Sequence, residues 1–247
     1  MLLPKFLSRR WWLATLIVIA GTLVLIRLGI WQLDRLAQRR AFNAQVVSAR
    51  SQPVLDLNQK QPQNIQEMEW RPVQFDGEYD FANQVALRNQ YFGTQYGYHL
   101  LTPLRSQGTA VLVDRGWIPA DGNAAPQDWR RYDEAGAVTV AGQIRLGQTK
   151  PALGGVADAL PADGSRLEVW NNADVQQIAG QLPYPILPIY IQPSPDAADT
   201  DPPIAYQPEV DLTEGPHLGY AMQWFTFAAI LFLGYPYYVR KQESKAT

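Results

Sequence analysis

Two long runs of apolar residues, one near each end of the chain, differ from everything between them. The first extends from Trp11 to Leu33 and contains Arg27 as its single charged residue. The second extends from Leu218 to Val239 and contains no Asp, Glu, Lys or Arg. A helix of about 20 apolar residues crosses a hydrocarbon core of roughly 30 Å. The pattern therefore predicts two transmembrane helices.

The first apolar run has the marks of a permanent anchor. Trp11 and Trp12 precede Trp31 by 20 and 19 residues, and about 29 Å of helix between them matches the two aromatic belts of one bilayer. A basic start before an apolar run also suits a secretory signal, but no small-x-small cleavage motif follows. No helix breaker occurs from Trp31 to Arg40. We therefore predict a transmembrane helix with an amphipathic extension over 11–40.

The middle of the chain alternates apolar and polar residues in short segments separated by turn residues. Strands are expected at 70–79, 84–90, 97–104, 109–119, 137–146, 165–170 and 185–192. The last of these is interrupted by proline, which favours the edge of a sheet. A short helix is expected over 172–180, capped by Asn172 and stopped by Gly180. The pattern predicts an α+β membrane protein in which two transmembrane helices flank an antiparallel, barrel-like β domain with one or two short helices.

Charge is distributed unevenly over these parts. Residues 1–40 and 217–247 hold ten Lys or Arg against two acidic residues, a net charge of +8, whereas residues 41–216 carry -10. An acidic middle repels phosphate backbones, so nucleic-acid binding is not expected. The chain has no cysteine, which excludes disulfides, thiolate nucleophiles and cysteine-ligated metals.

The positions of the basic residues predict the topology. Lys5, Arg9 and Arg10 at one end, and Arg240, Lys241 and Lys245 at the other, favour both ends in the cytoplasm. Arg35, Arg39 and Arg40 argue for the opposite orientation. The expected order is a cytoplasmic N-terminus (1–10), the first helix (11–40), an extracytoplasmic β-rich domain (41–192), a Pro/Asp-rich tether (193–214), the second helix (215–239) and a cytoplasmic tail (240–247).

His217 is the leading candidate for a functional side chain. It is one of two histidines and opens the second apolar helix directly after Pro216. An ionisable residue at the rim of a spanning helix indicates a functional site. A helix N-terminus disfavours imidazolium and so leaves the neutral ring that a metal needs. The alternative is an interfacial residue with a water-exposed ring nitrogen. On a helix, His217 shares one face with Tyr220, Ala221, Trp224, Ala228, Leu231 and Tyr235.

A second candidate is a stripe on the first helix. Arg27, Trp31, Arg35 and Arg39 recur every four residues, so they share one face, and an arginine over an indole ring forms a cation–π contact. The stripe either anchors the helix at anionic headgroups or clamps acidic groups of a ligand at the membrane surface. His217, Trp31 and Arg35 are therefore the candidate site residues.

Catalytic motifs do not appear. No Gly-x-Ser-x-Gly elbow, HExxH motif or glycine-rich phosphate loop occurs in the sequence. His99 lies in an expected strand, where a hydrogen-bonded structural imidazole is the usual interpretation. Asp114 and Arg115 suit an ion pair at a strand end. We predict that the protein is not an enzyme, and a membrane-anchored hydrolase using His99 or Asp114 ranks last among the hypotheses.

Five stretches together resemble the Surfeit locus protein 1 family of cytochrome c oxidase assembly factors. They are Leu-Gly-Ile-Trp-Gln-Leu-Asp-Arg-Leu (28–36), Arg-Pro-Val-Gln-Phe-Asp-Gly-Glu-Tyr (71–79), Gly-Tyr-His-Leu-Leu-Thr-Pro-Leu (97–104), Val-Leu-Val-Asp-Arg-Gly-Trp-Ile-Pro (111–119) and His-Leu-Gly-Tyr-Ala-Met-Gln-Trp-Phe (217–225). They occur in the family's order and span nearly the whole chain. Residues 120–165 and 193–211 lie outside the resemblance.

The resemblance implies a role in maturing the haem-copper oxidase subunit that receives haem a. It implies haem a as the cofactor and His217 as its metal ligand. We accordingly take His217, Trp31 and Arg35 as the cofactor-binding residues, and we expect Arg35 or Arg39, at the water boundary, to meet the haem propionates. The expected partners are haem-copper oxidase subunits, the haem-synthesis machinery and the lipid bilayer. Whether the chain forms a homo-oligomer is left open. With no transit segment ahead of the first helix, a bacterial member in the plasma (inner) membrane is expected. The alternative is a scaffold or chaperone that binds oxidase subunits without holding a cofactor.

Overall fold

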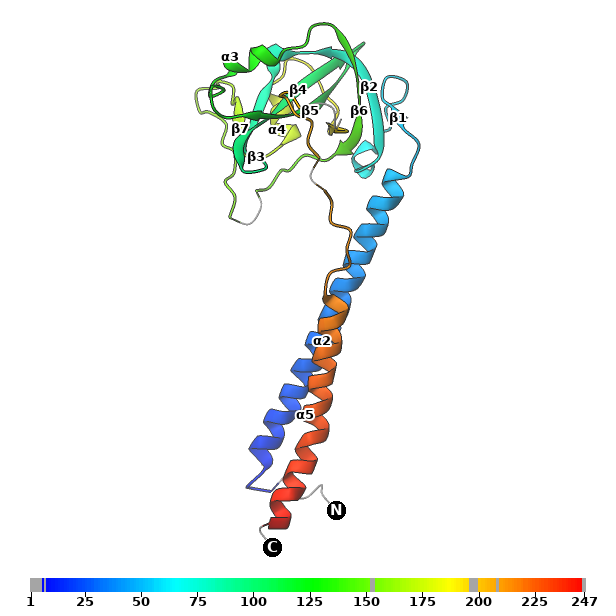
Figure 1. Ribbon diagram of the computed structural model, residues 1–247, viewed down its shortest axis with the longest axis vertical. Helices are drawn as coiled ribbons and strands as arrows, with labels where there is room; N and C mark the ends of the chain where they lie inside the picture. The colour runs from blue at the N-terminus through cyan, green and yellow to red at the C-terminus, as the bar shows by residue number, and fades with distance from the viewer. Residues whose placement is uncertain (1–5, 7, 152–153, 196–199, 208, 246–247) are drawn as a thin grey trace. The chain divides into compact units, whose positions relative to one another are not determined.

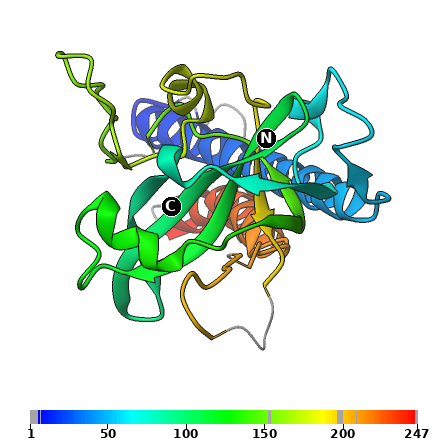
Figure 2. The ribbon, with the colours of Figure 1, turned by 90° about the horizontal axis from the view of Figure 1, so that it is seen from above.

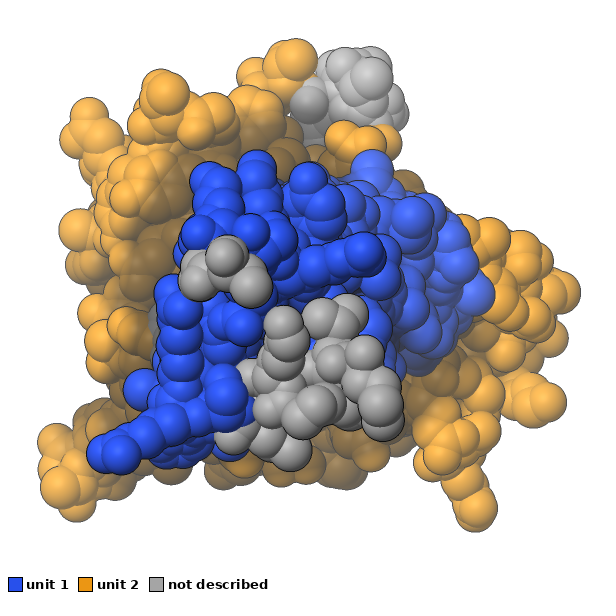
Figure 3. Space-filling model, turned by 90° about the horizontal axis from the view of Figure 1, so that it is seen from below, with its two compact units in different colours: residues 1–45, 211–247 blue, residues 46–210 orange. Residues whose placement is uncertain are grey.

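The computed structural model describes residues 6, 8–151, 154–195, 200–207 and 209–245 (Figure 1). Its chain forms two compact units, Met1–Gln45 with Asp211–Thr247 and Val46–Val210, which are coloured blue and orange in Figure 3. The first unit consists mainly of two long helices, and the second is built around a β-barrel (Figure 1).

The two long helices are α2, Trp12–Arg50, and α5, His217–Lys245. Both are long and apolar enough to span a membrane, which confirms the two apolar helices expected at the termini. With 39 residues, α2 extends about 58 Å, well beyond one hydrocarbon core. It continues to Arg50 because no glycine or proline occurs between Gly29 and Pro53. The ring of Pro53 then disfavours helical geometry in the residue before it.

The two helices of the first unit run antiparallel and pack along a seam of small residues. Thr15 near the start of α2 lies 2.7 Å from the hydroxyl of Tyr235 near the end of α5. A Cβ atom on Gly29 would lie 2.5 Å from the ring of Phe225, so only glycine permits this approach. On α5, Ala221 and Ala228 are buried in the seam. The expected face of α5 is therefore the one that packs on α2, although Tyr220 is exposed.

Five strands of the second unit close into a barrel (Figures 1 and 2). In ring order they are β2 (Pro72–Tyr79), β6 (Ala137–Arg145), β8 (Tyr190–Pro193), β5 (Thr109–Pro119) and β4 (Gln95–Ser106). The ring closes where Glu78 of β2 pairs with Arg105 of β4. Gly77 permits the closure, because a Cβ atom there would lie 2.4 Å from the carbonyl oxygen of Arg105. A buried cluster that includes Phe75, Leu104 and Ile191 forms the barrel core.

Shorter elements surround the ring. They are β1 (Leu55–Asp56), β3 (Val85–Phe92), β7 (Val169–Trp170), the helices α3 (Pro126–Trp129) and α4 (Val175–Gly180), and the 3-10 turns η1 (Ile65–Glu67), η2 (Phe81–Asn83) and η3 (Arg130–Tyr132). The sheet is mixed, because β1–β2, β3–β7 and β5–β8 pair in parallel. The long connection from β5 to β8 makes such pairing accessible, whereas a tight turn permits only antiparallel strands. The barrel-like fold with short helices is confirmed.

Two local expectations were wrong. The strand around 185–192 does not lie at an edge, because β8 sits between β5 and β6 inside the ring. Its paired residues begin at Tyr190, after Pro188, so that proline removes no ladder hydrogen bond. The cap of α4 is Asp174 rather than Asn172, since its carboxylate accepts from the backbone amides of Gln176 and Gln177.

Candidate functional site

His217 forms one contact that defines its chemistry. It is the first residue of α5, directly after Gly215 and Pro216, and its side chain is half-buried against α2. Its Nδ1 lies 2.8 Å from Oε1 of Gln32. An amide oxygen only accepts hydrogen bonds, so Nδ1 carries the proton and donates it. Nε2 is then the unprotonated nitrogen, with a lone pair available to a metal.

The arrangement around His217 suits a metal that needs few protein ligands. Metal-ligating histidines usually donate their second ring N–H to a fixed acceptor, which sets the tautomer and the ring orientation. Gln32 supplies that acceptor. Among the described residues no group of three or more His, Cys, Asp or Glu could hold a metal ion. A tetrahedral zinc site is therefore not built here, whereas haem iron takes only its axial ligands from protein.

Trp31 and Arg35 lie together on another face of α2. The Arg35 guanidinium carbon is 5.7 Å from the Trp31 ring centroid, and Arg35 Nη1 donates to Gln38 Oε1 at 3.1 Å. Trp31 is 42% exposed. Among the contacts of the described residues, none joins His217 to Trp31 or Arg35. The predicted site residues thus form one cation–π pair and one separate hydrogen-bonded imidazole.

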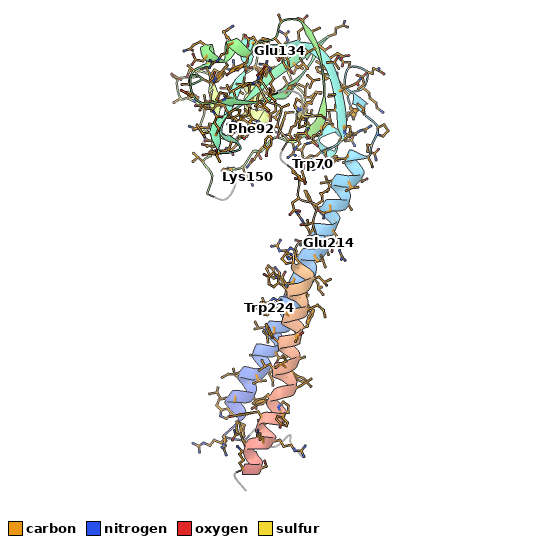
Figure 4. All side chains as sticks on the ribbon, in the orientation of Figure 1. Trp70, Phe92, Glu134, Lys150, Glu214 and Trp224 are labelled. Atoms are coloured by element: carbon orange, nitrogen blue, oxygen red, sulfur yellow. The ribbon has the colours of Figure 1, made fainter. Side chains whose placement is uncertain are left out.

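The other two arginines after Arg35 hold the chain that leads into α5. Arg39 donates to the backbone carbonyls of Asp211 and Thr213 and pairs with the Asp211 carboxylate at 3.2 Å. Arg40 forms a forked pair with Glu214 at 2.7 and 2.8 Å; Glu214 is labelled in Figure 4. The Arg40 hydrogen bond lowers the pKa of the Glu214 carboxyl. These contacts fix the entry to α5 and so the position of His217.

His99 lies inside the barrel unit and is paired with an acid. Its Nδ1 is 3.0 Å from both carboxylate oxygens of Asp114, and both side chains are buried. Burial alone would lower the pKa of His99, but the charge and hydrogen bonds of Asp114 outweigh it and raise that pKa. The interpretation of His99 as a hydrogen-bonded imidazole is confirmed. The expected pairing of Asp114 with Arg115 is not seen, because adjacent strand residues point to opposite faces.

Arg115 instead organises a buried polar cluster on the other face of β5. It pairs with Glu134, labelled in Figure 4, at 3.0 Å and donates to Gln84 at 3.2 Å. Its guanidinium lies over the rings of Tyr79 and Phe81. Burial raises the pKa of Tyr79 to about 12, so its hydroxyl stays protonated. The cluster has a structural role: it satisfies a buried cation.

Sequence reasoning missed Gln32 and Gly29. Both lie in the Leu-Gly-Ile-Trp-Gln segment, but attention to charged and aromatic residues favoured Trp31 and Arg35. The available signal was spacing: Gly29, Gln32 and Leu36 recur at helical intervals on the face of α2 opposite to its exposed residues. A polar residue on an otherwise apolar packing face indicates a specific partner.

Comparison with known proteins points to one family. The profile described as "SURF1 family" matches residues 19–229. A SURF1-like protein of Rickettsia bellii is 27% identical over 237 residues, covering 93% of this chain and 92% of that protein. An uncharacterized SURF1-like protein of Mycobacterium bovis is 29% identical, covering 94% and 85%. Surfeit locus protein 1 of Xenopus tropicalis is 24% identical, covering 93% and 76%.

Proposed function

The chain belongs to the SURF1 family, a non-enzymatic family known as cytochrome oxidase assembly factors, and we propose that this member holds haem a on His217 during oxidase maturation. It would act as a membrane-anchored carrier or chaperone for a haem-copper terminal oxidase. Haem a is its cargo, and no bond in the cargo is made or broken by the protein.

The hydrogen bond from His217 to Gln32 carries this proposal. At 2.8 Å it fixes the Nδ1–H tautomer and orients the ring, which prepares Nε2 as an axial ligand before the iron arrives. The scarcity of other ligating side chains among the described residues suits iron already held by a porphyrin. Neutral imidazole ligation is ordinary haem chemistry.

Arg35 is the arginine of this segment best placed to meet a propionate. Arg39 and Arg40 are engaged with Asp211 and Glu214, whereas the hydrogen bond of Arg35 within the described chain goes to a neutral partner, Gln38. A guanidinium binds a carboxylate through two parallel hydrogen bonds. Trp31 stacks on Arg35 and offers an exposed aromatic face beside it. These two residues would hold the polar edge of the cargo, while His217 would hold the iron.

The test is purification of the full chain in detergent from cells that make haem a. Wild-type protein should show a Soret band, and His217→Ala should lose it with most of the bound haem. Gln223→Ala is the matched control, because Gln223 is exposed on the same helix and should retain the wild-type spectrum. Haem content and Soret position that survive His217→Ala unchanged would exclude His217 as the ligand.

A scaffold without cofactor is the second candidate, and one observation favours it. The hairpin of β3 and β4 exposes Tyr91, Phe92 and Tyr96, which are 59%, 41% and 38% exposed. Exposed aromatic side chains are typical of protein interfaces. In that case an oxidase subunit should still co-purify with His217→Ala, and haem-free protein should still promote assembly. Failure of both would leave the haem-carrier proposal.

The localisation is proposed from the helix ends. The start of α2 and the end of α5 lie together, since Trp11 Nε1 donates to Glu243 at 2.9 Å, and basic residues gather there. The positive-inside rule then puts both ends in the cytoplasm of a bacterium, in its inner membrane, with residues 41–214 outside. Haem-synthesis proteins, oxidase subunits and a second copy of the chain are the proposed partners.

The absence of cysteine makes this topology simple to test. Ser165→Cys and Ser244→Cys each introduce one thiol at an exposed position. A membrane-impermeant maleimide applied to intact spheroplasts should label the cysteine at 165 and spare the one at 244. The reverse labelling pattern would overturn the proposed orientation.

A further inference from the structure

A polar cavity of about 330 Å³ opens into the barrel unit and is separate from the His217 contact. Its floor is formed by the buried side chains of His99, Asp114 and Gln192 together with the half-buried Tyr190. Its rim includes Tyr91, Tyr206 and Glu209, all exposed. A volume near 300 Å³ is the lower end of the range for small-molecule sites. The cavity has room for a ligand the size of one amino-acid residue.

The floor offers hydrogen-bond donors that the protein itself does not use. His99 is 5% exposed and its Nδ1 is engaged by Asp114, while Nε2 has no hydrogen-bond partner among the described residues. The hydroxyl of Tyr190 likewise has none in the described part of the chain. Burial, followed by the charge of Asp114, raises the pKa of Tyr190 to about 12, so it remains a donor. Neither atom is completely enclosed, so both can be reached from the cavity by the polar group of a ligand.

Asp114 itself is not free to accept from a ligand. Its Oδ1 accepts from His99 Nδ1 at 3.0 Å and from the Gly116 amide at 3.2 Å, and its Oδ2 lies 3.0 Å from His99 Nδ1. The carboxylate raises the pKa of His99 and so favours the protonated ring. In that form Nε2 of His99, a residue that lines the cavity, carries a hydrogen and is a donor.

One wall adds a cation stacked on an indole. The Arg145 guanidinium carbon is 3.7 Å from the Trp70 ring centroid, and Arg50 lies over the same ring at 5.4 Å. Trp70 has φ 72°, the left-handed region that bulky residues rarely adopt. Strained backbone of this kind gathers at ligand sites. Glu69 pairs with Arg145 Nε at 3.4 Å, which leaves the terminal nitrogens of Arg145 as donors.

From these groups we infer that the cavity binds a single carboxylate carried on a small aromatic or apolar body. The carboxylate oxygens would accept from His99 Nε2–H, the Tyr190 hydroxyl and Arg145. The body would lie against Trp70 and the rim tyrosines. The acidic rim residue Glu209 disfavours ligands with several negative charges, so a monoanion fits better than a phosphate. Such a carboxylate has two sources, a small organic acid or the C-terminus of a peptide.

The two histidines of the chain make the test direct. Full-length protein in detergent, labelled with 15N at histidine, is titrated with phenylacetate and with its neutral match, phenylacetamide. The His99 imidazole resonances, assigned with His99→Gln, should shift saturably with the acid and stay unmoved with the amide. N-acetyl-phenylalanine and its amide repeat the comparison for a peptide-like carboxylate, and the tighter acid identifies the source.

Two variants examine the donors. Tyr190→Phe and Arg145→Gln should each weaken phenylacetate binding by about tenfold or more, the range of one charge-assisted hydrogen bond. Arg130→Gln, a change of an exposed arginine in η3, should bind as wild type does. Equal shifts with acid and amide, or no saturating shift of His99 with either acid, would overturn the proposal. Neither result depends on haem binding at His217.

Discussion

The two histidines of this protein form the same hydrogen bond and yet acquire opposite chemistry. In each, Nδ1 meets a side-chain oxygen, and in each, Nε2 has no protein partner among the described residues. His217 meets the amide of Gln32 at 2.8 Å on a helix pair, whereas His99 meets the carboxylate of Asp114 at 3.0 Å inside a barrel. The difference between the two sites is one formal charge on the acceptor.

That charge decides what Nε2 can do. The carboxylate of Asp114 raises the pKa of His99 and so favours the ring that presents an Nε2–H group to a ligand oxygen. At His217 the neutral amide oxygen of Gln32 accepts from Nδ1–H, which leaves the lone pair of Nε2 for a metal. The comparison teaches that the partner of Nδ1, more than the burial of the ring, selects between a proton donor and a metal ligand.

The largest expected effect comes from removing the Asp114 carboxylate that pairs with His99. Asp114→Ala leaves a buried imidazole without its partner and should lower the free energy of unfolding by about 3 to 5 kcal/mol, the usual cost of breaking a buried pair. Denaturant unfolding followed by near-ultraviolet circular dichroism measures the loss. Asp121→Ala, at an exposed position, should change stability by less than about 0.5 kcal/mol. A loss of similar size in both variants would contradict the assigned role of the pair.

A smaller effect is expected from altering the acceptor at His217. Gln32→Leu removes the acceptor and should weaken haem affinity by about 10- to 100-fold, as loss of an outer-shell partner does. Gln32→Glu places a carboxylate at Nδ1, as Asp114 does at His99, and should weaken haem binding increasingly as the pH falls, because the carboxylate favours the protonated ring. Spectroscopic titration with haem measures both. If Leu and Glu behave alike, Gln32 affects packing and does not position the ring.

The smallest effect is a pH dependence of the barrel. The pKa of His99 is raised above its ordinary 6.5, so the folded protein binds this proton more tightly than the unfolded chain does. The stabilisation is then complete below pH 6.5 and is lost as the pH rises through the folded-state pKa. Each tenfold gain in proton affinity on folding is worth about 1.4 kcal/mol. Melting temperatures across this range should fall for wild type and stay flatter for His99→Gln. Parallel curves for the two proteins would contradict the raised pKa.

The sequence predicted the helices better than the barrel because helical periodicity is local. A run of about 20 apolar residues with at most one charge is typical of a membrane-spanning helix, and both long apolar helices are present. The strands β2 to β6 were also found from alternation and turn residues. A barrel-like sheet was expected, but the pairing that closes it was not, since it depends on Glu78 meeting Arg105 and no pattern within either strand encodes that pairing. The short β8 was assigned to an edge because the segment contains prolines. That rule applies only to residues that pair, and the paired residues begin at Tyr190, after Pro188.

The candidate site divides in the same way. His217 stood out by its rarity and its place at the start of an apolar helix, and Trp31 with Arg35 stood out by their four-residue spacing. Gln32 did not, because its partner lies 185 residues away. His99 and Asp114, 15 residues apart, were each noticed, but their pairing needed the register of β4 and β5.

Composition and periodicity alone determined that an apolar helix precedes and another follows an acidic, strand-rich segment. Both helix and strand types can be predicted locally, because the spacing of apolar residues shows which face of each element is buried. Tertiary structure decided which oxygen each imidazole meets, which strand closes the barrel and where donors face a cavity. Those outcomes depend on contacts between residues distant along the chain. Hydrogen bonds act only within about 3 Å, and no local pattern positions two remote atoms that closely.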